Sequence, residues 1–320
     1  MRILSGIQPS GRLHLGNYFG MMQPAIALQY QGEAFYFIAN YHALTTVFDA
    51  KALKDQTFEV ALDFLAAGLD PEKAVLFRQS DVPEVTELAW ILSTVTPMGL
   101  LERCHSYKDK LARGFQPSHG LFAYPVLMAA DILIYQADVV PVGKDQKQHV
   151  EVARDIVIKF NERFGETFKL PEPRIQQEVA TVLGVDGQKM SKSYNNGIFL
   201  SDEEKIFRKK VMGIKTDSTP MENPKPTEGS VILELYRLVV SPKEVASMIE
   251  SFQKGGVGYG EYKKQLFEVL WCSLASYRER RMALLANPKK VERILRLGAE
   301  KARGLAKTTL EQVREKVGLC

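Results

Sequence analysis

The first 142 residues alternate short apolar runs with longer stretches whose apolar positions recur at helical spacing. The short runs are rich in aromatic and β-branched residues, which is typical of buried strands, and the longer stretches are typical of amphipathic helices. The predicted elements are a strand at 2–8, a helix at 17–30, a strand at 34–38, a helix at 49–68, a strand at 74–77, a helix at 85–95 and a strand at 139–142. This alternation predicts an α/β domain with a parallel sheet, which binds ligands beyond the carboxyl ends of its strands.

The pattern changes after about Asp202, where strand-like runs give way to helical spacing. Helices are predicted at 230–240, 242–253, 262–285 and 288–317, with breaks that contain proline and glycine at 216–229 and 255–260. We therefore predict two domains, a parallel-sheet domain over residues 1–200 and an all-helical domain over residues 201–320 that ends in a terminal helix.

Length, cysteine content and hydrophobic runs argue against a disulfide-rich, zinc-binding or membrane protein. A chain of 320 residues can bury a full core without disulfides or metals, and Cys104, Cys272 and Cys320 form no CxxC or zinc pattern. This cysteine usage predicts a reducing, cytoplasmic setting. No apolar run is long enough to span a bilayer, and the first residues lack the apolar region of a signal peptide, so we expect no membrane partner.

Charge is unevenly distributed between the two predicted domains. Residues 1–200 contain 19 basic and 22 acidic side chains, whereas residues 201–320 contain 23 and 16. The basic excess in the second part favours a polyanionic partner that is contacted there, although an ordinary solvated helical surface would show the same excess.

The turn after the first strand contains a glycine-rich segment. Residues 6–11 match GxxxxG, but Arg12 and Leu13 follow where a P-loop requires Lys and Ser or Thr, so that class of phosphate site is excluded. The next four residues are His14-Leu15-Gly16-Asn17. Gly16 would let a flat adenine ring approach the backbone, and the helix that follows would offer N–H groups to phosphates. On these four residues alone, a simple turn with a glycine and a capping Asn is the better interpretation.

A second candidate segment is Lys189-Met190-Ser191-Lys192-Ser193, which follows a turn-rich approach at 184–187. Two lysines three residues apart, set among small polar residues, form a cationic loop that suits the phosphates of a leaving pyrophosphate. The alternative is a solvated basic loop, and we favour the phosphate-binding function because this five-residue pattern is specific.

These two segments, in this order, resemble the HIGH and KMSKS motifs of the class I aminoacyl-tRNA synthetases. Asn17 replaces the second histidine of HIGH, a substitution that is familiar in the tryptophanyl branch. The chain is similar to bacterial tryptophanyl-tRNA synthetases essentially from end to end, most densely at 5–17, 124–135, 139–149 and 189–195. The resemblance implies a Rossmann-like catalytic domain with both motifs, which activates L-tryptophan with ATP and transfers it to tRNA(Trp).

Residues 124–135 read as a helix with a proline in its first turn. Tyr124, Met128 and Asp131 share one face of it, and together they suit a flat aromatic ligand with one N–H. A core helix whose lone Asp pairs elsewhere is an equal alternative on these residues alone. The resemblance implies that Asp131 accepts the indole N–H, and that the other tryptophan-binding residues are Leu4, His42, Tyr124, Met128, Val140, Val142 and Gln146.

Tyrosine is the competing substrate, because tyrosyl enzymes resemble this family and also place an Asp on this helix. They usually carry a Tyr where this chain has Leu4, and an apolar residue there favours indole. Many tryptophanyl enzymes have Phe at that position, so Leu4 departs slightly from the pattern.

The resemblance also implies the ATP site. Lys189, Lys192 and Lys110 would stabilise charge on the phosphates, and Asp145 would bind the ribose hydroxyls. The ATP-binding residues would be Gln8, Ser10, His14, Gly16, Asn17, Gly143, Asp145, Met190 and Ser191. Mg²⁺ would be held mainly by the triphosphate, without a metal site made by the protein.

The implied reaction needs no protein nucleophile, since the tryptophan carboxylate itself attacks the α-phosphorus. The helical domain would bind the tRNA anticodon, with backbone contacts among Arg278, Arg280, Arg281, Lys289, Lys290, Arg293 and Arg296. The family works as a homodimer, and we expect the interface at residues 98–104. Three alternatives stay open: a tyrosyl-tRNA synthetase, a synthetase-like paralogue that has lost tRNA charging, and a non-catalytic RNA-binding protein on the same fold.

Overall fold

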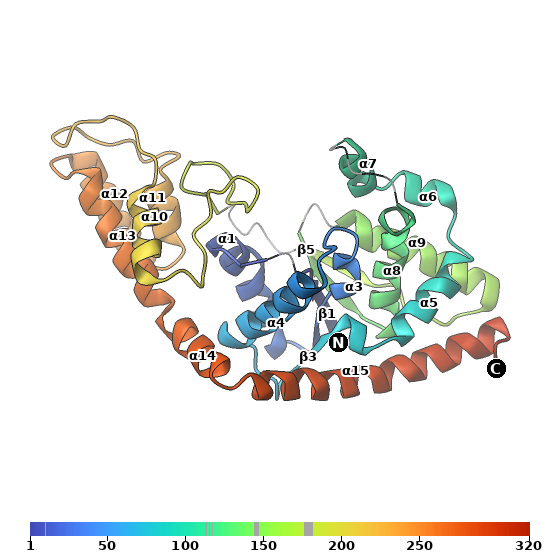
Figure 1. The fold of residues 1–320 in the computed structure, drawn as a ribbon. Coiled ribbons are helices and arrows are strands. Elements are labelled where there is room, and N and C mark those ends of the chain that lie inside the picture. The colour runs from blue at the N-terminus through green and yellow to red at the C-terminus, as the bar shows by residue number, and fades with distance from the viewer. Residues whose placement is uncertain (10, 113, 115, 117, 144–146, 176–181) are drawn as a thin grey trace.

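One parallel sheet organises the molecule (Figure 1). The computed structural model describes residues 1–9, 11–112, 114, 116, 118–143, 147–175 and 182–320, without the side chains of residues 105, 106, 109, 110 and 175. Within them the sheet has the order β3-β2-β1-β4-β5. Its strands are β1 Arg2–Ile7, β2 Glu33–Ile38, β3 Ala74–Arg78, β4 Val139–Val142 and β5 Glu172–Ile175. The four predicted strands are confirmed, and β5 lies in a segment that was not predicted as a strand.

The strand order creates a crevice at the centre of the sheet. The chain first runs outward from β1 through β2 to β3, and then returns to place β4 on the other side of β1. Connections therefore diverge where the carboxyl ends of β1 and β4 lie side by side, and parallel sheets bind ligands at such a switch point.

Alternating residues of β2 explain why both faces of the sheet are covered. Ala34, Tyr36 and Ile38 join one buried apolar cluster, whereas Phe35 and Phe37 join the cluster on the opposite face. The helices of the first part are α1 Leu15–Asn17, a π-helical turn Tyr18–Met22, α2 Gln23–Ala27, a 3₁₀ turn Leu28–Tyr30, α3 Asn40–Ala43, α4 Ala50–Ala66, a 3₁₀ turn Gln79–Asp81, α5 Glu84–Ser93, α6 Met98–Glu102, α7 His105–Ala112, α8 His119–Ile134 and α9 Lys147–Phe164.

Two helix predictions need correction. α8 begins at His119, because the Ser118 hydroxyl caps it by accepting the Leu121 N–H at 3.1 Å. Pro125 therefore lies inside the helix, not in its first turn as predicted. The predicted helix at 262–285 is two helices, α13 Tyr259–Ser273 and α14 Ala275–Leu285, which meet at the buried Leu274.

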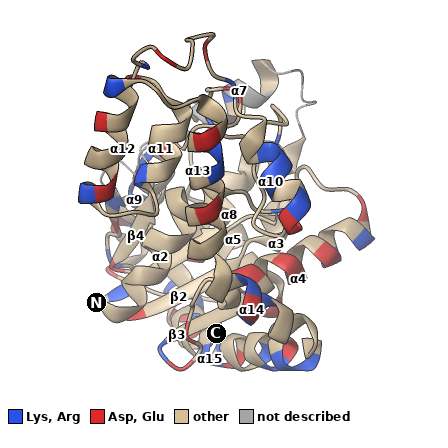
Figure 2. Cartoon of the chain, turned by 90° about the vertical axis from the view of Figure 1, so that its left-hand side faces the viewer, with Lys and Arg blue, Asp and Glu red and all other residues tan. Residues whose placement is uncertain are grey.

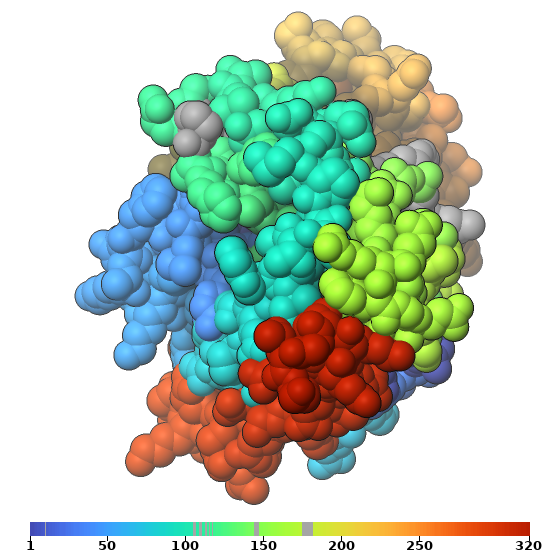
Figure 3. Space-filling model, turned by 90° about the vertical axis from the view of Figure 1, so that its right-hand side faces the viewer, coloured from blue at the N-terminus to red at the C-terminus, as the bar shows by residue number. Residues whose placement is uncertain are grey.

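The second part of the chain is helical in the described residues, with α10 Glu204–Met212, α11 Val231–Arg237, α12 Pro242–Lys254, α13, α14 and α15 Pro288–Val317. Helices α10–α13 stand beside the sheet, α14 packs on α4, and α15 runs beneath the sheet along β3 and α5 (Figure 1). The carboxyl end of α15 rests on the segment that contains α5 (Figure 3). The domain boundary near residue 200 stays a prediction. None of the described helices combines the length and the apolar character that crossing a membrane requires.

Candidate active site

The loop after β1 enters the crevice and turns into α1 through His14. His14 Nδ1 accepts a hydrogen bond from the Asn17 N–H at 3.2 Å, and the Asn17 side-chain oxygen accepts one from the His14 N–H at 3.1 Å. A Cβ at Gly16 would lie 2.9 Å from His14 Nδ1, so glycine leaves room for this ring. The reciprocal cap therefore holds two of the predicted ATP residues, His14 and Asn17, together, with Gly16 between them in sequence.

The electrostatic surroundings of His14 keep its ring neutral. Burial, and in second place the charge of Lys192, lower the pKa of His14 from 6.5 to about 4. Because Nδ1 accepts a hydrogen bond from the backbone, the ring proton of the neutral form lies on Nε2. At pH 7 the ring can thus donate one hydrogen bond without bringing a further positive charge to the site.

The lysine loop, which we define as residues 189–193, lies against this turn although it is about 175 residues away in sequence. The Gly16 N–H points at the Met190 sulfur at 3.4 Å, and the Lys192 ammonium donates to the Gly11 carbonyl at 3.0 Å. Met190 is buried in the contact, whereas Lys189 is exposed. The fold therefore brings the two predicted motifs into direct contact at the crevice.

A buried carboxylate on α8 forms the centre of the second half of the site. Asp131 is 1% exposed. His42 Nε2 lies 2.8 Å from its Oδ2, and Gln79 Nε2 donates to both of its oxygens at 2.8 Å. The Tyr41 N–H in turn donates to the Gln79 side-chain oxygen at 3.0 Å, which sets the orientation of that amide. A carboxylate can accept about four hydrogen bonds, and these contacts occupy three of those positions.

Burial raises the pKa of Asp131, while the hydrogen bonds from His42 and Gln79 act in the opposite direction. Gln79 was missed by the sequence analysis. The available signal was its position directly after β3, at the same sheet edge as the other predicted ligands.

The apolar wall predicted for an aromatic ligand is also assembled. Leu4, Met128, Val140 and Val142 belong to one contiguous apolar cluster, although they come from β1, α8 and β4. On the same face of α8 the Tyr124 hydroxyl lies 2.8 Å from the Nε2 of His149, a buried residue that was not predicted.

Part of the predicted ATP and tryptophan sites lies outside the described residues. Ser10, Asp145 and Gln146 lie outside the described residues, as does the side chain of Lys110. Gln8 and Gly143 are described, and both are exposed directly after β1 and β4. Their position at the switch point agrees with nucleotide contact, but the roles of all these residues stay predictions.

The basic residues proposed for tRNA separate into two groups. Arg281 is paired with Asp63 and Glu59 of α4, Arg280 donates to the Ala66 carbonyl, and Arg278 lies 3.6 Å above the Trp271 ring. These three therefore hold α14 to its neighbours. Figure 2 shows both signs of charge interspersed on α4, α12 and α13, whereas α10 is mostly basic.

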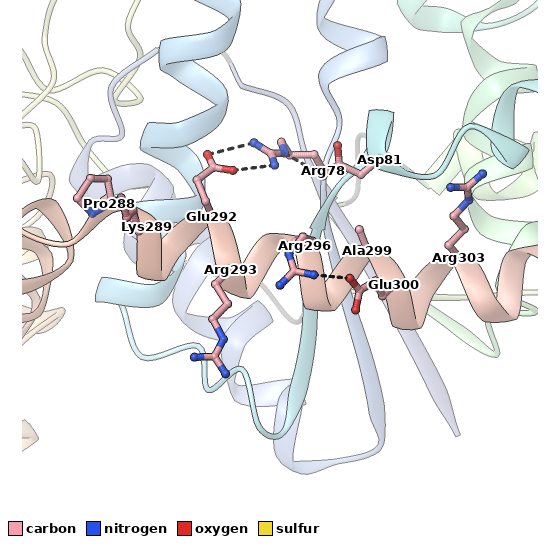
Figure 4. A pocket seen from close by; sticks show the side chains of 10 residues that line it. All are labelled: Arg78, Asp81, Pro288, Lys289, Glu292, Arg293, Arg296, Ala299, Glu300 and Arg303. Atoms are coloured by element: carbon pink, nitrogen blue, oxygen red, sulfur yellow. Dashed lines mark hydrogen bonds and ion pairs between the residues drawn. The ribbon is translucent and has the colours of Figure 1, made fainter.

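In the second group, Lys290 is exposed. Lys289, Arg293 and Arg296 line a groove of about 700 Å³ between α15 and the end of β3 (Figure 4). Its cations are Arg78, Lys289, Arg293, Arg296 and Arg303. Arg78 pairs with Glu292 at 2.8 Å and Arg296 with Glu300 at 2.8 Å, while the Arg293 side chain points away from both pairs. The groove thus carries more positive than negative side chains.

An apolar cavity of about 790 Å³ opens beside the Asp131 site, between α3, α5 and α8. Its lining includes Phe48, 88% exposed, and Trp90, 73% exposed. In the predicted interface segment, Leu100, Leu101 and Cys104 are buried in the chain's own core, which leaves Met98, Glu102 and Arg103 exposed at the surface.

Comparison with known proteins gives one consistent result. Residues 1–274 match the family model described as tRNA synthetases class I (W and Y). The chain is 52% identical to the tryptophan–tRNA ligase of Rhodopirellula baltica and 50% identical to that of Campylobacter jejuni, in both cases over all of each chain. It is also similar to the crystal structure of the Campylobacter jejuni enzyme in complex with ADP and tryptophan, with a TM-score of 0.95, 49% identity, and coverage of 99% of this chain and 100% of that one.

Proposed function

This chain belongs to the tryptophanyl-tRNA synthetases of class I, which activate tryptophan with ATP and transfer it to tRNA, and we propose that it performs both steps in the crevice between β1 and β4. The observation that carries this proposal is the contact of the lysine loop with the His14 turn, together with the buried, hydrogen-bonded Asp131 on α8. A nucleotide and an aromatic amino acid could meet there.

The first step would be an in-line attack of the tryptophan carboxylate on the α-phosphorus of ATP. A carboxylate–phosphorus bond forms, the bond to the β-phosphate oxygen breaks, and pyrophosphate leaves. The carboxylate is already ionised, so the protein contributes orientation and charge stabilisation and no general base. We assign orientation of the nucleotide to Gln8, Ser10, His14, Gly16, Asn17, Gly143, Asp145, Met190 and Ser191.

Positive charge near the phosphates would come from Lys189, Lys192 and Lys110. Lys192 is held on the Gly11 carbonyl, so binding of the triphosphate would exchange this neutral acceptor for an anionic one. Mg²⁺ is part of the proposal, because it usually binds through substrate phosphates and waters and would neutralise their charge. The described residues contain no cluster of three carboxylate, histidine or cysteine side chains to hold it.

Tryptophan would bind with its indole N–H on the remaining acceptor position of Asp131. A buried carboxylate rejects a ligand without a matching donor, because the acceptor would stay unpaired. Leu4, Met128, Val140 and Val142 would pack against the ring, with His42, Tyr124 and Gln146 completing the pocket.

In the second step a terminal ribose hydroxyl of tRNA would attack the adenylate carbonyl and release AMP. We propose that residues 201–320 form the tRNA-binding part, with the α15 groove as a contact for the RNA backbone. The three free cysteines are consistent with a proposed cytoplasmic location, which cell fractionation would check.

We further propose a homodimer. The exposed Phe48 and Trp90 beside the apolar cavity support it, since such apolar patches commonly mark protein interfaces. Sedimentation equilibrium would overturn this proposal if the protein stayed monomeric at micromolar concentration.

The deciding experiment is amino-acid-dependent ATP–pyrophosphate exchange with tryptophan, tyrosine and phenylalanine, on the wild type, Asp131→Asn and the control Asp155→Asn. The control removes an exposed carboxylate on α9. We expect exchange with tryptophan only. In Asp131→Asn we expect kcat/KM for tryptophan to fall about ten- to a hundredfold, which corresponds to the usual free-energy contribution of a hydrogen bond to a charged group.

Each other outcome has a defined meaning. Exchange with tyrosine in place of tryptophan would retain the chemistry and overturn the pocket. A folded wild type that shows no exchange with any of the three amino acids would refute the enzymatic proposal and favour an RNA-binding role.

A further inference from the structure

Resting on the proposed function, we propose that Asn196 is a positioning residue for adenylate formation, which sets the shape of the lysine loop before ATP binds. Asn196 lies outside the five-residue motif and was not predicted as a site residue. It is 2% exposed, although the three residues before it are exposed. A buried amide in a surface loop has to be paired, and its partners decide what it holds.

The backbone brackets the lysine loop at both ends. On the entry side the Met190 N–H donates to the Val182 carbonyl at 2.9 Å, within a hairpin that turns at 184–187. On the exit side the Leu15 N–H donates to the Ile198 carbonyl at 2.9 Å, next to the His14 turn. Between these anchors the Asn195 N–H donates to the Lys192 carbonyl at 3.2 Å, and the Asn196 carbonyl accepts the Val185 N–H at 3.0 Å. The Ser191 N–H, in the middle of the lysine loop, is bound by a side chain.

The side chain that binds the Ser191 N–H is that of Asn196. Its oxygen accepts the Ser191 N–H at 2.8 Å, and its amide nitrogen donates to Asp186 Oδ1 at 2.8 Å and to the Lys189 carbonyl at 3.2 Å. One side chain therefore joins the hairpin turn, the first lysine and the middle of the lysine loop. The amide cannot be reversed, because its oxygen would then face a carboxylate and a carbonyl.

Steric fit and electrostatics agree with this function. A Cβ at Gly184 would overlap the Asn196 amide, so the turn is shaped around that side chain. The hydrogen bond from Asn196 is also the first cause that holds the pKa of Asp186 below its usual range, which keeps this acceptor ionised.

The hydrogen bonds of the Asn196 side chain lie where they can affect catalysis. Ser191, whose N–H is held, lies between Met190 on Gly16 and Lys192 on the Gly11 carbonyl. Fixing the backbone at Ser191 and Lys189 sets the starting directions of both lysines relative to the nucleotide turn. Asp131 and its partners lie on other elements and are not touched by this network.

The test is therefore a comparison of substrates. Asn196→Ala should lower kcat/KM for ATP in tryptophan-dependent exchange by about tenfold or more, since three part-buried hydrogen bonds are lost. KM for tryptophan should stay within about twofold. The matched control is Asn195→Gly. Asn195 is exposed with φ 51°, a backbone conformation that glycine adopts readily, and this variant should resemble the wild type.

Exchanging the amide of Asn196 and the carboxylate of Asp186 distinguishes a positioning role of Asn196 from a general effect on folding stability. Asn196→Asp alone places two carboxylates in contact and should be worse than Asn196→Ala. In the double variant Asp186→Asn/Asn196→Asp, the new amide at 186 can donate to the new carboxylate at 196, which still accepts the Ser191 N–H. The double variant should recover part of the ATP-specific loss, but not all of it. The Lys189 carbonyl remains without its donor, and the Gln188 N–H, which Asp186 Oδ1 accepts at 3.0 Å, loses its acceptor to the new amide nitrogen.

Limited trypsin cleavage provides a readout that does not depend on turnover. In folded Asn196→Ala, cleavage after Lys189 and Lys192 should be faster than in the wild type. Unchanged ATP kinetics and unchanged cleavage would overturn the proposal, and so would equal losses for ATP and tryptophan that follow a drop in melting temperature. A wild type without exchange would instead refute the proposed function, and cleavage alone would then decide whether Asn196 shapes the loop.

Discussion

At the scale of single residues, the proposed site contains two titratable groups, His14 and Asp131, in which burial shifts the pKa towards the neutral form. For His14, burial and the nearby Lys192 lower the pKa, and for Asp131 burial raises it. They differ in their partners, because donors from His42 and Gln79 favour the charged form of Asp131. Asp131 can therefore serve as an acceptor, while His14 serves as a neutral donor.

His14 should make folding stability depend on pH. The unfolded chain takes up a proton on this ring near pH 6.5, and the folded chain only near pH 4. The folded state binds fewer protons between these values, so its stability should fall by about 3 kcal/mol as the pH drops from 6.5 to 4. The contribution is fully present above pH 6.5.

The measurement is the free energy of unfolding by urea as a function of pH, in the wild type and in His14→Asn. Asparagine retains a capping side chain and has no titratable ring. The free energy of unfolding of the wild type, relative to that of His14→Asn, should fall as the pH is lowered from 6.5 to 4. Parallel curves over that range would show that His14 titrates normally.

At the scale of elements, α15 is fitted to the sheet by a glycine. A Cβ at Gly298 would overlap the Leu76 carbonyl of β3, and Ala299, Ala302 and Ala306 continue the same small, buried stripe. Two ion pairs, Arg303 with Glu84 and Arg314 with Glu87, hold the remainder of the helix to α5.

Gly298→Ala should therefore destabilise the protein, although alanine is the better helix former. The control lies in the same helix: Gly304 is exposed, and a Cβ there meets nothing within 4 Å. We expect Gly304→Ala to raise the free energy of unfolding by up to about 1 kcal/mol, and Gly298→Ala to lower it by about 1–3 kcal/mol through overpacking. Equal effects in guanidinium unfolding would contradict the close contact with β3.

At the scale of the whole molecule, the α15 groove lies beside the end of β3, at one edge of the sheet, whereas the proposed active site lies between the carboxyl ends of β1 and β4 in its centre (Figure 1). RNA contacts in the groove should thus affect tRNA binding and leave adenylate formation unchanged. The three arginines of α14 differ from the groove cations, because they contact other helices of the same chain. Their substitution would remove structural contacts and would not test RNA binding.

Arg293→Ala and Arg296→Ala should each raise KM for tRNA in aminoacylation. Each should also reduce the slope of log affinity against log salt by about 0.9 per lost phosphate contact. Tryptophan-dependent exchange should not change. Lys159→Ala, which removes an exposed cation on α9, is the control. If both groove variants retain the wild-type salt slope, the groove is not an RNA contact.

Sequence patterns were sufficient for the elements whose signals are local. The strands at β1–β4, the Asp49 cap of α4 and the bounds of α15 follow from apolar period and capping residues. The start of α8 was misplaced because a proline in the interior of a helix resembles one in its first turn. The short strand β5 has no distinctive pattern, since its pairing partner β4 defines it.

The sequence by itself determined the family, the fold class and the two motifs, because these depend on local residue patterns. Only the tertiary structure decided that Met190 rests on Gly16, that Gln79 orients Asp131 and that Asn196 closes the lysine loop. Each of these contacts joins residues from separate segments, and a buried polar group has to take whichever partner the fold places beside it. The identity of that partner is a property of packing, which no local pattern encodes.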